Sequence, residues 1–489
     1  MNMQRFYLYL NMTKPGEKLI LSYSDTNAKG EGISPAYLIG SILSLYPKLK
    51  IENSHYYPEN PEAGIDLFLE KLVQETEKEH EDSLEQADET DAMFGELYSW
   101  YLRNPEYRSR VQKLVQSAFA GKPKDIISQS VAKALYGEVS PYSATRLERF
   151  AACAFAHFLQ YGMKLTERVE YEFKPMDMGN VMHEALESFA EEVRKRGMKW
   201  TELTEQERNE IADRCLDNIV ADYGNTVLKS SARNEYMIER TRRILRRTVW
   251  ALQKQLEQGE FQPEGFEVTF GGGRIDRVDI MEDQNKVYVK VIDYKTGNTS
   301  FDLVYLYHGL QLQLMIYLDG ALRVEQKKYP DKEIIPAGVF YYNIKDPMIQ
   351  EKIDADVEAV SAGLMKELKM NGLAQADPEL VYRMDSSLGS IPVAFNKDGS
   401  FRKNSSVADR TQFAVLGRYV RTKIEKIRSS ILEGDAEVSP YELGKKNACT
   451  YCPYMTVCGF DRRLSGYEFR RLKNFSDEEL WKAFDREAE

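Results

Sequence analysis

Two carboxylates and a lysine fall at spacings that suit catalysis in two neighbouring apolar stretches. Asp276 lies in the first stretch, and Asp293 and Lys295 lie in the second. Because side chains on a strand alternate between its faces, Asp293 and Lys295 point the same way, whereas Asp276 and Asp279, three residues apart, do not. We therefore expect only one of that pair in the site. Carboxylates on adjacent strands bind a hard divalent cation, and a neighbouring lysine steers the attacking water, which suits phosphodiester hydrolysis.

A histidine on a helical segment is a candidate for a further ligand. Residues 178–194 have helical periodicity, and Gly179, His183 and Glu187 share one face at intervals of four. Glu187 is spaced to orient the His183 ring as a hydrogen-bond acceptor. The simpler alternatives are that Asp-x-Lys is a surface ion pair and that His183 is an ordinary histidine. The grouping of these residue types favours a site.

These segments resemble the motifs of the PD-(D/E)XK nucleases, in particular those of the RecB-like branch. The matches follow the order of that family and are Gly179-Asn-Val-Met-His183, Gly273-Arg-Ile-Asp276, Asp293-Tyr-Lys295, and Gln313-Leu-Met-Ile-Tyr317 or the overlapping Gln311. The resemblance implies a catalytic cation, Mg²⁺ or Mn²⁺, whose ligands are His183, Asp276, Asp293 and the carbonyl of Tyr294. It makes Lys295 the catalytic lysine. It gives Gln311 a role in contacting DNA or ordering the site, and it leaves Tyr317 to packing.

Three cysteines near the carboxyl end form a tight cluster. Cys449, Cys452 and Cys458 have the spacing C-x2-C-x5-C in a chain that contains five cysteines. Three thiolates need a fourth ligand to complete a tetrahedral site or a four-iron cluster, and Cys153 is the leading candidate. Cys215 is the spare, expected to be a small buried apolar residue.

Residue types alone do not separate iron–sulfur from zinc at this cluster. His157, one helical turn after Cys153, keeps a Cys3His zinc site as a lesser alternative, and reduced unligated cysteines are another. A cysteine before the nuclease motifs and C-x2-C-x5-C after them resembles the iron staple of AddB-type helicase–nuclease subunits. That resemblance implies a [4Fe–4S] cluster that ties the ends of the domain together, so that its loss unfolds the domain.

The resemblance to AddB-type subunits covers most of the chain. It includes residues 142–165, at the entry to the nuclease domain, and residues 338–347, on a later strand. Ala154 departs from the family, which has proline after the first cluster cysteine, but ligation needs only the sulfur. No G-x-x-x-x-G-K-[ST] segment occurs, so we expect no ATPase site in this chain.

The hydrophobic pattern predicts the elements that position these residues. Predicted strands are residues 265–270, 273–281 and 287–294, as an antiparallel meander, then 337–344, with a further one at 168–173. Predicted helices are residues 178–194, 303–322 and 409–433, and residues 385–406 form an irregular excursion. The fold class is α/β, and the resemblance makes it a restriction-endonuclease-like PD-(D/E)XK core with a mixed central sheet and flanking helices.

A different segment precedes this core. A strand at residues 19–24 feeding a helix at 34–45 looks like the tail of a RecA-like helicase domain, followed by helices. We therefore expect a helicase-like remnant over residues 1–135, the stapled nuclease domain over 136–475, and a tail over 476–489.

Composition limits the possible functions. The 489 residues predict about three domains, and 66 basic against 77 acidic residues give a net charge of −11. That balance argues against a surface covered in positive charge, as nonspecific nucleic-acid binding would need, but it leaves room for local basic helices. No apolar run approaches the 18 or so residues of a membrane span. The apolar stretch among the first residues is too short for a secretory signal, so we expect a cytoplasmic protein with no membrane partner.

Together these features predict a metal-dependent DNA exonuclease domain that acts in double-strand break repair and recombination. The resemblance implies single-stranded DNA or DNA ends as substrate, with the 5′-ended strand as the one degraded, and an AddA-like helicase–nuclease subunit as partner. The alternatives are a non-catalytic DNA-binding or assembly module of the same complex and a free-standing CRISPR-associated-type iron–sulfur nuclease.

Overall fold

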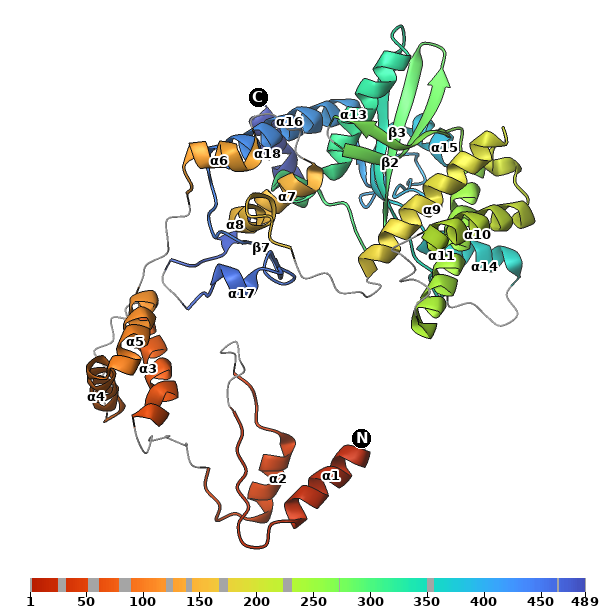
Figure 1. Ribbon diagram of the computed structural model, residues 1–489. Coiled ribbons are helices and arrows are strands. Elements are labelled where there is room, and N and C mark those ends of the chain that lie inside the picture. The colour runs from red at the N-terminus through yellow and green to blue at the C-terminus, as the bar shows by residue number, and fades with distance from the viewer. Residues whose placement is uncertain are drawn as a thin grey trace. The chain divides into compact units, whose positions relative to one another are not determined.

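The structure is a computed structural model that describes residues 2–24, 32–51, 61–78, 89–119, 126–137, 143–166, 175–222, 231–271, 273–349, 356–463 and 466–488. The chain divides into two units, Met1–Phe119 and Ala120–Glu489 (Figure 1). The boundary predicted from the sequence lies later, at residue 135. Helix α6 (Gln129–Tyr136) belongs instead to the second unit, because it packs on α16 (Arg410–Glu433).

The first unit is helical in its described residues. Its helices are α1 (Asn2–Thr13), α2 (Tyr37–Leu45), η1 (Glu62–Gly64), α3 (Ile65–Lys78), α4 (Glu89–Arg103) and α5 (Pro105–Ala118). Phe68, Leu97 and Tyr101 form the centre of a small core among α3, α4 and α5. The predicted strand at residues 19–24 is wrong: these residues are exposed, and the described part of the unit holds no strand to pair with them.

A six-stranded mixed sheet forms the core of the second unit. Its strands, in spatial order, are β1 (Gln262–Phe270), β2 (Gly273–Asp283), β3 (Lys286–Lys295), β4 (Glu333–Asn343), β5 (Asn371–Gln375) and β6 (Val407–Ala408). The first three pair antiparallel, which confirms the predicted meander. β4 lies parallel to β3, as a crossover through helices allows.

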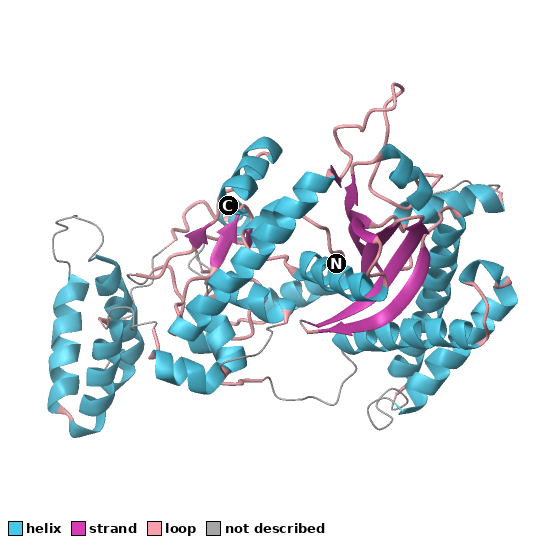
Figure 2. Ribbon diagram, turned by 90° about the horizontal axis from the view of Figure 1, so that it is seen from above, coloured by secondary structure: helices cyan, strands magenta, loops and turns pink. Residues whose placement is uncertain are grey.

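Helices cover both faces of this sheet (Figures 1 and 2). On one face, α9 (Pro175–Lys195), α10 (Glu205–Asp222) and α11 (Ala232–Glu257) share a core with Ile292 and Tyr294 of β3. On the other, α13 (Gln313–Lys328) and α16 share a core with Val289 and Val291. Strand alternation therefore directs Asp293 and Lys295 toward the α13 layer.

The second unit also contains further helices and a small separate sheet. They are α7 (Ala144–Ala152), α8 (Ala154–His157), η2 (Phe158–Gly162), η3 (Trp200–Glu202), α12 (Leu303–Tyr307), α14 (Val357–Glu367), α15 (Pro378–Met384), α17 (Met455–Cys458), α18 (Asp477–Ala488), and a small sheet of β7 (Tyr441–Leu443), β8 (Lys446–Asn447) and β9 (Arg470–Arg471). Among the described residues, no helix is both long and apolar enough to cross a membrane.

Several predicted elements differ from those observed. The helix predicted at 303–322 is two helices, α12 and α13, because Gly309 adopts a φ of 77° and ends the first. The predicted tail contains α18, whose Leu480 and Phe484 are buried in the core on α16. Residues 385–406 are irregular as predicted, yet Ile391 and Val393 are buried. The strand predicted at 168–173 lies outside the described residues.

A buried ion-pair network holds the meander on the face away from α13. The Asp279 carboxylate accepts from Arg277 Nε at 2.6 Å and lies 3.0 Å from Lys290 Nζ. The three side chains are almost fully buried, and the Trp200 and Phe266 rings flank the guanidinium of Arg277. Asp279 is therefore structural, which leaves Asp276 as the member of the pair that faces the candidate site.

Substituting Asp279 should destabilise the second unit. Asp279→Ala leaves two buried cations without their anion, and we expect it to lower the free energy of unfolding by about 3–5 kcal/mol in urea denaturation. The control is Glu282→Ala, which removes an exposed ion pair with Lys332 and should cost less than about 1 kcal/mol. Equal small losses in the two variants would contradict a structural role for Asp279.

Candidate active site

The register of the meander lines up three carboxylates. In the β2–β3 pairing Arg277 lies opposite Ile292. The residue before Arg277, Asp276, therefore lies opposite the residue after Ile292, Asp293. In β1, Glu267 takes the corresponding position opposite Asp276. Opposed residues on antiparallel strands have Cβ atoms roughly 5 Å apart, so three acidic side chains are crowded at one place on the sheet.

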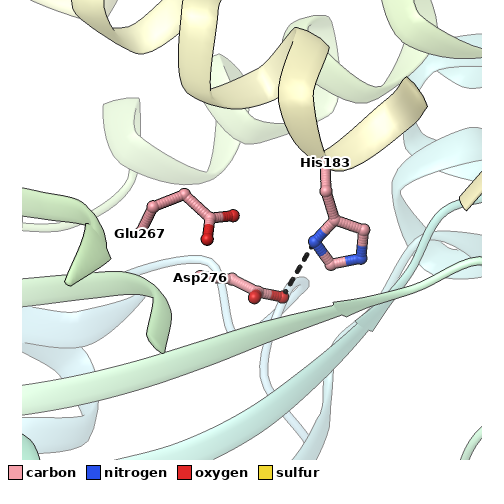
Figure 3. A group of neighbouring side chains, drawn as sticks. All are labelled: His183, Glu267 and Asp276. Atoms are coloured by element: carbon pink, nitrogen blue, oxygen red, sulfur yellow. Dashed lines mark ion pairs between the residues drawn. The ribbon is translucent and has the colours of Figure 1, made fainter. Parts of the chain in front are cut away.

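Helix α9 brings a histidine to this row. His183 Nδ1 lies 3.3 Å from Asp276 Oδ2, and the ligand atoms of His183, Glu267 and Asp276 lie within 4.8 Å of one another (Figure 3). Gly179, one turn earlier, permits this approach, because a Cβ there would stand 3.3 Å from Thr296 Oγ1 just after β3. The partner of the His183 ring is Asp276 rather than the predicted Glu187.

Burial and mutual repulsion shift the protonation of the acids. Burial, and then the charge of Asp276, raises the pKa of Asp293 to about 7, and the same two causes raise the pKa of Glu267 to about 7. Burial lowers the pKa of His183, but the hydrogen bond to Asp276 and its charge outweigh this and raise it. The raised pKa values of Asp293 and Glu267 reflect an excess of negative charge in the cluster, which a divalent cation would offset.

Lys295 is held at the end of the row. Its Nζ lies 2.7 Å from Asp293 Oδ2 and donates to Gln313 Oε1 at 2.7 Å. The amide of Gln313 in turn donates to the Tyr317 hydroxyl at 2.9 Å. The Lys295 side chain keeps 28% of its surface exposed, so the ammonium is fixed in direction yet accessible from solvent.

Gln311 lies beside this centre and has other partners. Its side chain accepts from the Asp302 backbone N–H at 3.0 Å and donates to the Ser300 carbonyl at 2.9 Å. Gln313, the overlapping candidate in the same motif, is the glutamine that reaches Lys295. Gln311 thus orders the loop before α12, and its predicted contact with DNA stays a prediction.

Glu267 and Glu148 belong to this region and were not predicted from the sequence. Glu267 was detectable by counting back from the turn between β1 and β2, where Phe270 pairs with Gly273. Its φ of 49° is unusual for a non-glycine residue in a strand. Glu148 of α7 accepts from backbone N–H groups at the start of α13, and a contact so distant in sequence leaves no local signal.

Four of the five cysteines lie around one cavity. Cys153, at the end of α7, lines it together with Cys449, Cys452 and Cys458. Burial, and then the other three thiols, raises the pKa of Cys449 to about 12. Cys215 is buried elsewhere, in the core of the α9–α11 layer, as expected.

The histidine alternative for this cavity finds no support in the geometry. His157 is fully buried, and its Nε2 accepts from Arg146 Nε at 3.1 Å. The residues that line the cavity include Ala156 but not His157. A fourth cysteine is therefore a better ligand candidate than the imidazole.

The basic helices that could serve as phosphate sites are partly neutralised. In α11, Arg242 pairs with Asp217 at 2.7 Å and Arg243 with Asp346 at 2.6 Å. In α16, Arg421 pairs with Asp319 at 2.8 Å. Surface arginines that pair with acidic side chains in this way are typical of solvated helix faces.

Comparison with known proteins assigns the family. The model of the PD-(D/E)XK nuclease superfamily matches residues 141–459. A protein of Lachnoclostridium phytofermentans, named as the B-type subunit of an ATP-dependent helicase/deoxyribonuclease, is 40% identical over 99% of this chain and 43% of its own length. Proteins of the same name from Alkaliphilus metalliredigens and Clostridium acetobutylicum are 31% and 32% identical over 99% of this chain and 44% of theirs.

This chain spans less than half the length of those relatives. The family model begins near α7, whereas the sequence similarity to the relatives covers almost all of the chain, including the segment before α7. The predicted resemblance to AddB-type subunits is thereby confirmed, and the chain belongs to the PD-(D/E)XK nuclease superfamily.

Proposed function

We propose that this chain is the nuclease part of an AddB-type helicase–nuclease subunit and that it hydrolyses phosphodiester bonds of single-stranded DNA. The observation that carries this proposal is the row of Glu267, Asp276 and Asp293, joined by His183 and ending at Lys295. A DNA-binding or assembly module has no need of buried acids that repel one another. Such crowding is costly unless a cation is bound.

A divalent cation, Mg²⁺ or Mn²⁺, suits this set of donors. The proposed ligands are His183, Asp276, Asp293 and the Tyr294 carbonyl, with Glu267 as a further carboxylate. Mostly oxygen donors with a single imidazole favour such hard cations over softer ones. When bound, the cation lowers the pKa of a water molecule and withdraws charge from the phosphate.

The side chains themselves supply orientation. Asp293 and Gln313 fix the Lys295 ammonium, which then orients the attacking water and offsets the charge that develops on the phosphoryl oxygens. The backbone N–H of Tyr294 donates to Asp276 Oδ2 at 2.7 Å and holds that carboxylate beside His183.

The name of the relatives supports a proposal for the wider role. Their name joins an ATP-dependent helicase to a deoxyribonuclease, and we infer that this chain acts with an AddA-like subunit that delivers DNA ends in the cytoplasm. In that setting it degrades the 5′-ended strand during double-strand break repair and recombination, without an ATPase site of its own.

We further propose that a [4Fe–4S] cluster occupies the cysteine cavity. Four thiols around one cavity match the ligand number of such a cluster, and metal binding would relieve the mutual repulsion of their thiolates. The cluster would join Cys153 to Cys449, 449 − 153 = 296 residues later, and so close a long segment of chain.

Removing the charge of Asp293 should abolish cleavage without unfolding the protein. We expect Asp293→Asn and Lys295→Ala to lower Mg²⁺-dependent degradation of end-labelled single-stranded DNA by about 10²–10³-fold or more. Because the raised pKa of Asp293 means that its charge opposes folding at pH 8, Asp293→Asn should melt no lower than wild type in chelator. Asp319→Asn, which alters a surface ion pair on α13, is the matched control. A folded wild type that cleaves no DNA, with or without an AddA-like partner, would favour the assembly-module alternative.

Glu267→Gln should lower the affinity for the cation rather than the maximal rate of cleavage. We expect the Mg²⁺ concentration for half-maximal cleavage to rise about 10-fold or more, with the rate at saturating Mg²⁺ largely retained. Mg²⁺ should also raise the melting temperature of the wild type more than that of the variant. Identical Mg²⁺ titrations of the two proteins would remove Glu267 from the ligand set.

Cys452→Ser should lose iron and stability together. We expect the wild type, purified without oxygen, to contain iron and sulfide, and the variant to lack both and to melt at a lower temperature. Cys215→Ala is the matched control, since it removes a buried thiol away from the cavity and should keep its iron. Wild-type protein that holds zinc, or no metal at all, would overturn the iron–sulfur assignment.

A further inference from the structure

The helix that carries Gln313 does not cap its own first turn. Helix α13 begins after Leu312, whose apolar side chain cannot accept the N–H groups left free at a helix start. Glu148 of α7 accepts them instead: its Oε1 lies 2.7 Å from Leu312 N and 3.0 Å from Gln313 N. The cap is therefore supplied by a segment 164 residues earlier in the chain.

This carboxylate stands in a costly environment. Burial raises the pKa of Glu148 to about 7, against the lowering effect of the two backbone N–H groups. A negative charge at a helix N-terminus is favourable, but many neutral or exposed side chains would serve as a cap alone. The position of Glu148 also matters because the residue that it caps, Gln313, contacts Lys295.

Gln313 links Glu148 to Lys295 by two hydrogen bonds. The backbone N–H of Gln313 is held by Glu148, while its side-chain oxygen accepts from Lys295 Nζ at 2.7 Å. Tyr317, one turn later, accepts from the other end of the same amide. Since Gln313 is the first residue of α13, any fraying of that turn would move the oxygen away from the ammonium.

We propose that Glu148 is a positioning residue for Lys295, acting through the first turn of α13 and the side chain of Gln313. The proposal rests on the proposed function, in which Lys295 is the catalytic lysine. It adds a residue that touches neither substrate nor cation and that would nevertheless set the rate.

Two measurements on purified protein test the proposal. The first is the rate of reductive methylation of Lys295, followed by mass spectrometry with Lys482 of α18 as the internal standard. The second is kcat and KM for single-stranded DNA at saturating Mg²⁺, well below the melting temperature. The variants are Glu148→Ala, Glu148→Gln, Gln313→Ala and the double variant Glu148→Ala/Gln313→Ala.

The control removes an equivalent cap elsewhere. Asp377 accepts from the N–H groups of Glu379 and Leu380 at 3.0 and 3.3 Å and so caps α15. Asp377→Ala should lower stability in a similar way while leaving Lys295 methylation and kcat at wild-type values.

Glu148→Ala should speed Lys295 methylation several-fold and lower kcat about 10–100-fold with little change in KM. Glu148→Gln keeps an oxygen acceptor and should restore both values, and the double variant should match Gln313→Ala, because both changes act on one link.

If Glu148→Ala lowers only the melting temperature, as Asp377→Ala does, Glu148 is a structural cap and the proposal fails. If the wild type cleaves no DNA, the proposed function fails, while the methylation rates still decide whether Glu148 positions Lys295. Should Glu148→Ala not fold, Glu148→Asp, shorter by one methylene, takes its place in both measurements.

Discussion

Repulsion between carboxylates that face one another across the meander is the constraint on which the rest of the site depends. Two charges roughly 5 Å apart repel by about 3 kcal/mol at an effective dielectric constant near 20. Asp276 has such a neighbour on each side, Glu267 and Asp293. Three neighbouring groups offset this repulsion by ion pairing or hydrogen bonding with the carboxylates: the His183 ring, the Lys295 ammonium and the Tyr294 N–H.

The other face of the same strands carries a buried carboxylate that is paired with cations. There the Asp279 carboxylate lies between two cations, Arg277 and Lys290, and pairs with both. Asp276 and Asp279 are three residues apart, so strand alternation places Asp279 in a structural ion-pair network and Asp276 in the acidic cluster. The structural network and the side chains of Asp293 and Lys295 thus lie on opposite faces of one sheet.

Local patterns predicted the features that depend on neighbouring residues. Alternation in β2 and β3 predicted the meander and the choice of one acid from the pair Asp276 and Asp279, and helical spacing brought Gly179 and His183 to one face of α9. Features set by long-range pairing were beyond such patterns. Glu267 needs the register of β1, and Glu148 needs the packing of α7 on α13.

Two errors in the predicted elements have different physical origins. Residues 19–24 have the apolar composition of a strand, yet strand formation needs a hydrogen-bonded neighbour, which composition does not report. The helix expected over 303–322 is divided at Gly309, whose left-handed backbone ends α12 and lets Leu312 and Gln313 begin α13 beneath Glu148.

Helix α7 connects the two centres of the domain. It carries Glu148 in its middle and ends at Cys153, on the cavity lined by the four cysteines. Its last turn is also held from the carboxyl-terminal segment, where Arg470 of β9 donates to the Ala151 carbonyl. Glu148 and Cys153 are only five residues apart, which is roughly 7.5 Å of rise along a helix. The same nine residues therefore carry both the carboxylate that caps α13 and a cysteine of the cavity. A cluster bound at that cavity, as we propose, would thus act on the surroundings of Lys295 as well as on folding.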